Sequence, residues 1–297
     1  MRQRLAFVLV AVLPGCGSVV GRPSDGSTEV APRCDPSKPF GSATPLGGLG
    51  GFELQQSLSF VAGELTAYVA LAHLPAAGQR SDFDIYKATR ASDVAEFATP
   101  TKVGISTTDN EPSVGISEDG EVMVFAREPA AASTTDLYEA DAAADGSFPS
   151  ATRLAISMPG VDEGVPHLWG EAKTLYFSRY VDGVKFNDAF YAVRSGGVYS
   201  TAAEVPGVNT TAYENAAVVS ASGLQLILNR ADVMYVGTRT STGGDFAVTE
   251  LRDDAGTQIA GSVDWVSADG CRLYYSKATY SNNALVSSRL YVRSRPL

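Results

Sequence analysis

Three glutamates recur at one position of an internal repeat, and they are the first candidates for chemistry. When the turns of the repeat are aligned without gaps, Glu111, Glu163 and Glu214 coincide, whereas Gly261 and Leu54 occupy the position elsewhere. Three carboxylates around the mouth of a channel could hold a cation or a basic segment of a partner. Catalysis, however, needs carboxylates whose pKa values are pushed apart. We therefore interpret the repeated glutamates as acceptors for neighbouring backbone amides, with binding as the alternative.

Asp264 and Glu163 are the pair of acids that could hydrolyse a glycosidic bond. Such hydrolysis needs two carboxylates at a defined separation across the sugar, and nothing in the spacing of the sequence singles out this pair. Three further residues of the expected inner strands are candidates for the channel mouth: His167, Trp169 and Trp265. Tryptophan rings stack on sugars or peptides, but they more often pack between neighbouring repeats. For His167 we favour a hydrogen-bonded place in the channel wall.

Metal and cofactor chemistry has little support in the sequence. His73 and His167 are the only histidines, and no third ligand lies near either of them. Four aspartates begin corresponding strands, which suits turn capping better than metal ligation: Asp84, Asp136, Asp188 and Asp232. The sequence contains no nucleophile elbow and no phosphate-binding loop. We predict no metal and no cofactor.

The elements that would position these residues are repeated hairpins. The clearest copies are 267–276 and 117–126, in which Asp-Gly supplies the φ > 0 position of a tight turn between two strands. Weaker copies are 169–178, 220–228 and 63–69. A spacing of about 50 residues is typical of a propeller or another repeat array.

Each hairpin is followed by a third and a fourth strand, and four short antiparallel strands form a propeller blade. The expected fourth strands are 97–103, 148–156, 199–205 and 246–251. The fifth repeat ends without one, but 40–46 closely matches 148–154. We therefore predict an all-β, five-bladed β-propeller over residues 39–297, whose last blade is completed by the N-terminal strand. Such closure removes exposed sheet edges.

Two cysteines agree with this closure. Cys34 precedes the closing strand, and Cys271 begins the second strand of the last repeat. In an up-and-down blade these two points lie at the same end of the sheet, and an exported protein meets an oxidising compartment. We predict a Cys34–Cys271 disulfide, and two free thiols are the alternative.

The N-terminal segment has the features of an export signal. A short basic start precedes an apolar run over 5–13 that is too short to span a bilayer. The following Leu13-Pro14-Gly15-Cys16 resembles a bacterial lipobox, which implies a signal peptide over 1–15, lipidation of Cys16, and a lipid-anchored flexible linker over 16–38. An ordinary secreted protein is the alternative. The net charge of −10 argues against a nucleic-acid partner.

The repeats resemble the WD40-like repeat of TolB-type β-propellers. The best match is 110–120, with Glu111-Pro112-Ser113 before Ser117-Glu118-Asp119-Gly120, and the next is Ser267-Ala268-Asp269-Gly270. The resemblance implies a periplasmic or surface protein that binds partners through one face of a disc, and it does not imply catalysis.

These observations lead to one functional prediction and two alternatives. We predict a monomeric, exported propeller, lipid-anchored to the outer membrane, that binds an envelope protein as a scaffold module and is not an enzyme. The first alternative is a carbohydrate-binding or glycoside-hydrolase-like propeller, and the second is a disc that spaces other envelope components. Two non-equivalent carboxylates with a stacking aromatic at the channel mouth would favour the first alternative.

Overall fold

The computed structural model of this 297-residue chain describes residues 33–297 except positions 62, 77–78, 131, 133, 182–184 and 282–283. Within these ranges the chain forms strands and turns and no helix. It follows that this part of the chain has no helix able to cross a membrane. The expected signal peptide, the lipidation site Cys16 and residues 16–32 of the expected linker lie outside the described residues.

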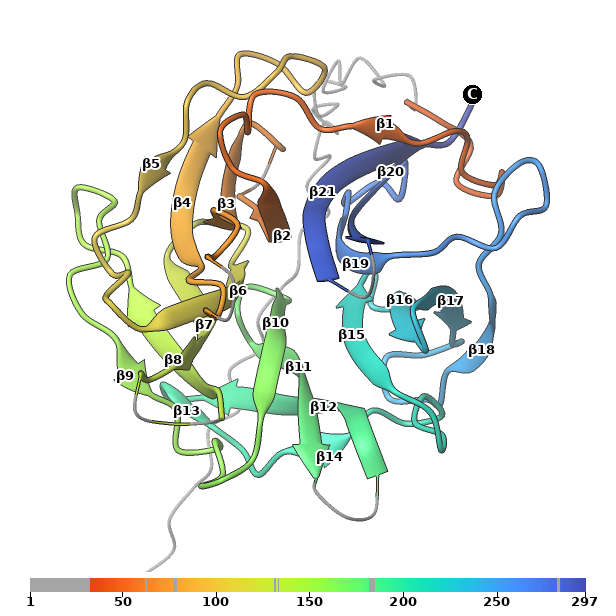
Figure 1. Cartoon of the computed structure of the whole chain (residues 1–297). Coiled ribbons are helices and arrows are strands. Elements are labelled where there is room, and N and C mark those ends of the chain that lie inside the picture. Colours follow the sequence, from red (N-terminus) through yellow and green to blue (C-terminus); the bar gives the residue numbers. More distant parts are fainter. Residues whose placement is uncertain are drawn as a thin grey trace, which may run out of the picture. The chain divides into compact units, whose positions relative to one another are not determined.

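The repeats supply successive sets of antiparallel strands, and Figure 1 shows the first strand of each set around the centre of the molecule. The first strands are β2 (Leu54–Phe60), β6 (Asn110–Ile116), β10 (Glu163–Trp169), β15 (Glu214–Val219) and β19 (Ser262–Val266). The second strands are β3 (Thr66–Ala72), β7 (Val122–Glu128), β11 (Thr174–Val181), β16 (Gln225–Arg230) and β20 (Arg272–Ser281). The third strands are β4 (Asp84–Thr89), β8 (Asp136–Asp141), β12 (Lys185–Ser195), β17 (Val233–Thr238) and β21 (Ala284–Ser294).

The outermost strands are shorter than the sequence predicted. They are β1 (Thr44–Pro45), β5 (Thr101–Lys102), β9 (Thr152–Arg153), β13 (Val198–Tyr199), β14 (Ala203–Glu204) and β18 (Ala247–Glu250). Proline has no N–H to donate to a ladder and is confined to strand ends and edges. Pro100 immediately precedes β5, Pro149 lies three residues before β9, and Pro206 lies two residues after β14.

The strands assemble into several sheets of the propeller type. One has the order β6-β7-β8-β9, one β15-β16-β17-β18, and one β10-β11-β12-β13 with β14 beside β12. An eight-stranded sheet has the order β19-β20-β21-β2-β3-β4-β5, with β1 beside β21. In this sheet β2 and β21 pair in parallel only at Leu54 and Ser288. The prediction of an all-β fold built from four-stranded antiparallel sheets is therefore confirmed.

The N-terminal strand lies beside the C-terminal one. In β1, Thr44 and Pro45 pair antiparallel with Val292 and Tyr291 of β21 (Figure 1). The ladder is extended at one end by a hydrogen bond from the Leu46 N–H to the Leu290 carbonyl, at 2.9 Å. The two ends of the folded body are thus joined in one sheet.

The predicted disulfide is confirmed and has a charged neighbour. Cys34 and Cys271 are bonded, with their Cα atoms 5.6 Å apart. The adjacent Arg33 forms ion pairs with Glu64 at 2.7 Å and with Asp269 at 2.7 Å. Both acids belong to turns between first and second strands, so the chain is fastened to that end of the body from Arg33 onward.

The core consists of apolar side chains between adjacent sheets. Val124 and Leu137 of one sheet, for example, belong to the same buried cluster as Leu168 and Phe177 of the next. Because alternate residues of a strand point to opposite faces, every sheet buries apolar residues on both sides.

Candidate functional site

The first strands are interrupted by bulges where they approach the centre. Register shifts occur between Gln56 and Leu58 in β2 and between Val263 and Trp265 in β19, and the other first strands have equivalent shifts. Ser57 and Val165 adopt φ values of 51° and 48°, which are uncommon for residues other than glycine. A bulge re-aims side chains out of the normal alternation, and here it places polar groups toward the channel.

Hydrogen bonds from sheet to sheet cross the channel wall at these bulges. The Val114 N–H donates to Ser57 Oγ at 2.8 Å, and the Val165 N–H donates to Ser113 Oγ at 3.1 Å. The Ser57 N–H donates in the same manner to Asp264 Oδ1, at 3.0 Å. A serine hydroxyl is therefore sufficient to accept such a bond. Among these three bonds, the acceptor is a carboxyl only in the one made by Asp264.

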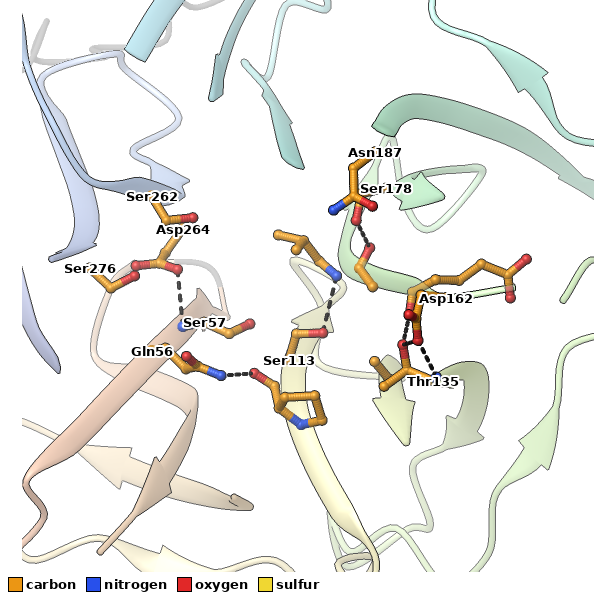
Figure 2. A pocket seen from close by; sticks show the side chains of 15 residues that line it. Gln56, Ser57, Ser113, Thr135, Asp162, Ser178, Asn187, Ser262, Asp264 and Ser276 are labelled. Carbon is orange, nitrogen blue, oxygen red and sulfur yellow. Dashed lines mark hydrogen bonds between the residues drawn. The ribbon is translucent and has the colours of Figure 1, made fainter. Parts of the chain in front are cut away.

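These groups border a polar pocket of about 260 Å³ at the end of the channel where the first strands begin (Figure 2). Hydroxyls and amides dominate its lining, and three carboxyl groups belong to it, those of Asp162, Glu163 and Asp264. The polar side chains labelled in Figure 2 are Gln56, Ser57, Ser113, Thr135, Asp162, Ser178, Asn187, Ser262, Asp264 and Ser276. A lining of this kind can exchange hydrogen bonds with a ligand that carries many hydroxyl groups.

Asp264 has part of its carboxyl group buried in the wall of the pocket. Its Oδ2 atom is buried and has no hydrogen-bond partner among the described residues. Burial raises the pKa of this carboxyl to about 8, although the Ser276 hydroxyl and the Ser57 N–H lower it. A buried carboxyl favours its neutral form because the charged form loses its hydration. At neutral pH Asp264 is therefore a carboxylic acid that can donate a proton.

Asp162 lies on the other side of the pocket from Asp264, with its carboxylate toward Thr135 (Figure 2). Its Oδ1 accepts hydrogen bonds from the Thr135 N–H at 2.8 Å and the Thr135 hydroxyl at 3.3 Å. In another repeat, Asn110 Oδ1 accepts the equivalent bond from the Phe83 N–H at 2.9 Å. An amide thus serves the fold equally well, and the carboxylate at position 162 is not required for this bond.

The three repeated glutamates are bound inside their own sheets. Each accepts a hydrogen bond from the Nε–H of an arginine at the end of a second strand: Arg127 to Glu111 at 2.9 Å, Arg179 to Glu163 at 3.0 Å, and Arg230 to Glu214 at 2.7 Å. None of the three glutamate side chains has exposed surface. Burial raises the pKa of Glu111 and Glu163 against the opposing effect of the guanidinium groups.

This arrangement separates Glu163 from the chemistry of the pocket. The residue borders the pocket, but its carboxylate is held by Arg179 and by the Met158 N–H at 3.1 Å. Both acids that the sequence suggested as a hydrolytic pair keep one buried oxygen without a hydrogen-bond partner among the described residues, but the carboxylate of Glu163 is also paired with a guanidinium group.

The remaining sequence candidates lie in the walls between sheets. Trp169 Nε1–H donates to the Ser220 carbonyl at 2.9 Å, and His167 Nε2 lies 3.2 Å from the Val219 carbonyl. Desolvation lowers the pKa of His167 to about 4, so it is neutral. Trp265 is 9% exposed and packs against Phe60 and Tyr274, with ring centroids 5.0 and 5.9 Å away.

Several pocket residues were not among the sequence candidates. Asp162 directly precedes the repeated glutamate, where Asn110 stands in another repeat, and this replacement of an amide by an acid was a usable signal. Ser57 and Ser276 gave no such signal, because isolated serines are common in strands and turns. Within the described ranges, no group of three His, Cys, Asp or Glu side chains is placed to hold a metal ion.

No protein-family model matches the sequence, and no curated protein matches it. Solved structures do resemble the fold. A family 117 glycoside hydrolase from the marine bacterium Zobellia galactanivorans is 12% identical at a TM-score of 0.58, with 86% of this chain and 90% of that chain covered. The α-L-arabinofuranosidase PaAbf62A from Podospora anserina, in complex with cellotriose, is 12% identical at 0.53, with 88% and 98% covered. A TolB-like protein from Agrobacterium tumefaciens is 15% identical at 0.52, with 84% and 78% covered.

These similarities establish a β-propeller fold and correct one prediction. TolB-like and glycosidase structures match almost equally well, so the resemblance to TolB is not specific. The prediction that the chain is not an enzyme was wrong, because it treated this repeat fold as non-catalytic, whereas two of these similar structures are glycoside hydrolases. At such low identity the likeness concerns the fold, and any activity has to be argued from the site.

Proposed function

We propose that this chain is a carbohydrate-active propeller that binds a glycan in the channel pocket and hydrolyses a glycosidic bond. The observation that carries the proposal is the presence of two carboxyl groups, Asp264 and Asp162, where neutral residues make the corresponding structural bonds in other repeats. A change from a sufficient neutral residue to an acid costs stability when the acid is buried. We therefore assign the acids at these two positions a role in function.

The two acids have different environments, as glycoside hydrolysis requires. Asp264 is protonated at neutral pH and donates its proton to the glycosidic oxygen as the bond from that oxygen to the sugar carbon breaks. Asp162, oriented by Thr135, accepts the proton of the attacking water. A rotation about the Cβ–Cγ bond of Asp264 turns the protonated oxygen toward the ligand.

The test is hydrolysis and binding by the purified protein. We expect release of reducing sugar from cello-oligosaccharides, or of nitrophenol from 4-nitrophenyl glycosides that include the α-L-arabinofuranoside. Asp264→Asn should lower kcat at least about 100-fold, since general acids contribute about 10²–10⁴. The activity of the wild type should fall as pH rises through about 8. A matched control is Asp141→Asn, whose carboxylate is 74% exposed. If the protein neither binds nor hydrolyses any member of a broad glycan panel, the proposal is refuted.

We propose that the sets of strands form a ring of five blades, with the pocket at one end of its channel. In this arrangement the eight-stranded sheet is divided into two blades at the β2–β21 bridge, and β1 completes the last blade. Hydrogen bonds pass between successive first strands or their sheets and return to the start: Ser57–Val114, Ser113–Val165, His167–Val219, Asn229–Val263 and Asp264–Ser57. Such a circuit is what a closed propeller of five blades requires.

We propose further that the protein is exported and anchored through Cys16. Arg33 and Cys34 attach to the end of the body that carries the turns between first and second strands, and the pocket lies at the opposite ends of the first strands. Arg33, the first described residue after the expected linker, is thus held at the end of the body away from the pocket. Cys16→Ala should move the protein from the membrane fraction to the soluble fraction of an expressing bacterium, and unchanged membrane association would argue against lipidation.

A further inference from the structure

The hairpin of β20 and β21 extends beyond the strand that it covers. Ser262 of β19 pairs with Ser276 of β20, and β20 then continues to Ser281 without a partner in β19. The extension is instead paired with β21 as far as Ser281 and Ala284. By contrast, β16 ends at Arg230, which pairs with Val233 at the start of β17, so that hairpin has no such extension. The paired extension of β20 and β21 thus forms a wall beside the pocket, made on the β20 side by residues 277–281.

A second hollow of about 370 Å³ lies against this wall. It shares Gln56, Ser262 and Ser276 with the pocket that contains Asp264, so the two adjoin. Tyr280 and Lys277 of the extended hairpin also line it. A ligand with more than one unit could therefore contact both hollows.

Tyr280 is an unusual residue for an exposed strand end. It is 65% exposed, although burial of an aromatic ring normally contributes to stability. Lys277 makes no ion pair with any described residue, and it lies opposite another cation, Arg289, in the ladder. An aromatic face beside an uncommitted donor is suited to a sugar ring, whose C–H face packs on the aromatic ring and whose hydroxyls accept hydrogen bonds.

We propose that this second hollow is a sugar subsite with Tyr280 as its stacking platform, so that the ligand is an oligosaccharide chain and not a single sugar. The proposal rests on the proposed function and adds the size and direction of the substrate. One unit of the chain lies at Asp264, and the chain leaves the channel past the β20–β21 hairpin.

The test uses chain length. Binding of glucose, cellobiose, cellotriose and cellotetraose, and of the xylose series of one to four units, is measured by calorimetry on wild type, Tyr280→Ala and Tyr280→Phe. We expect affinity to rise about tenfold or more from one unit to two or three. Tyr280→Ala should lose about tenfold for the longer ligands and little for the single sugar, as stacking energies of this kind allow. Tyr280→Phe keeps the ring and should retain the gain.

The outcomes separate the two proposals. Binding that does not increase with chain length, or an equal loss for all lengths in Tyr280→Ala, overturns the second subsite and leaves the proposed function in place. Binding of no member of either series, together with no hydrolysis of the broader panel, overturns both. Since Tyr280 is largely exposed, its replacement should leave the unfolding transition unchanged, which circular dichroism verifies.

Discussion

Asp264 should make the stability of this protein depend on pH in a direction opposite to that of most carboxylates. Its pKa is raised to about 8 in the folded protein from 3.8 in an exposed chain, chiefly by desolvation. Between these two values the unfolded chain has released the proton while the folded protein still holds it. The free energy of unfolding therefore falls as pH rises from about 4 to about 8, and this contribution is level above and below that window.

The size of the effect follows from the shift. A difference of one pKa unit corresponds to about 1.4 kcal/mol, and four units would give an upper limit of between about 5 and 6 kcal/mol. Asp264 lines a pocket that water can enter, so we expect about half of this limit, or about 3 kcal/mol. Asp264→Asn retains an acceptor for the Ser57 N–H and removes the ionisation. It should match the wild type near pH 4 and exceed it by about 3 kcal/mol at pH 8.5.

Urea unfolding of both proteins at half-unit steps from pH 4 to 9, followed by tryptophan fluorescence, measures this difference. Other carboxylates titrate in both proteins, so only the difference between the two curves is diagnostic. Asp141→Asn, at an exposed position, should give a curve parallel to that of the wild type. If the Asp264→Asn curve were also parallel, Asp264 would be ionised at neutral pH, and its assignment as the proton donor would fail.

Three further predictions follow from the contacts. Asp162→Asn should abolish hydrolysis yet change the free energy of unfolding by no more than about 0.5 kcal/mol, because Asn110 makes the equivalent bond with an amide; a large loss in urea unfolding would instead assign Asp162 to the fold. Cys271→Ser opens a covalent loop with a sequence separation of 237 residues and should cost up to about 5 kcal/mol in the chain-entropy model; a wild type whose unfolding midpoint is insensitive to reductant would contradict this. Glu214→Ala removes the carboxylate that pairs with the largely buried side chain of Arg230 and should lower the free energy of unfolding by about 3–5 kcal/mol. Glu214→Gln should lower it less. Equal stability of the two variants in thermal unfolding would show that the ion pair contributes little.

The repeat architecture was accessible from the sequence because it depends on local patterns. Asp-Gly at 119–120 and 269–270 specifies tight turns by its tolerance of positive φ, and alternating apolar residues on either side specify strands. The pairing of Cys34 with Cys271 and of β1 with β21 was also predictable, since a repeat that lacks its last strand requires one from elsewhere in the chain. The shortness of the outer strands was not foreseen, although Pro100 and Pro149 were visible in the sequence.

The candidate site was only partly accessible, because it depends on what surrounds each acid. Asp264, Glu163 and Asp162 are all acids near the start of a first strand. The replacement of Asn110 by Asp162 is visible in the sequence, but nothing there shows which of the three acids keeps a proton. Glu163 pairs with Arg179 across its own sheet, Asp162 accepts from Thr135 of another repeat, and Asp264 accepts from the Ser57 N–H of a strand about two hundred residues earlier. Local patterns along the chain were enough to predict the strands, their order and the covalent closure. Which carboxyl holds a proton depends on desolvation and on hydrogen-bond donors from distant parts of the chain, and these are known only once the chain is folded.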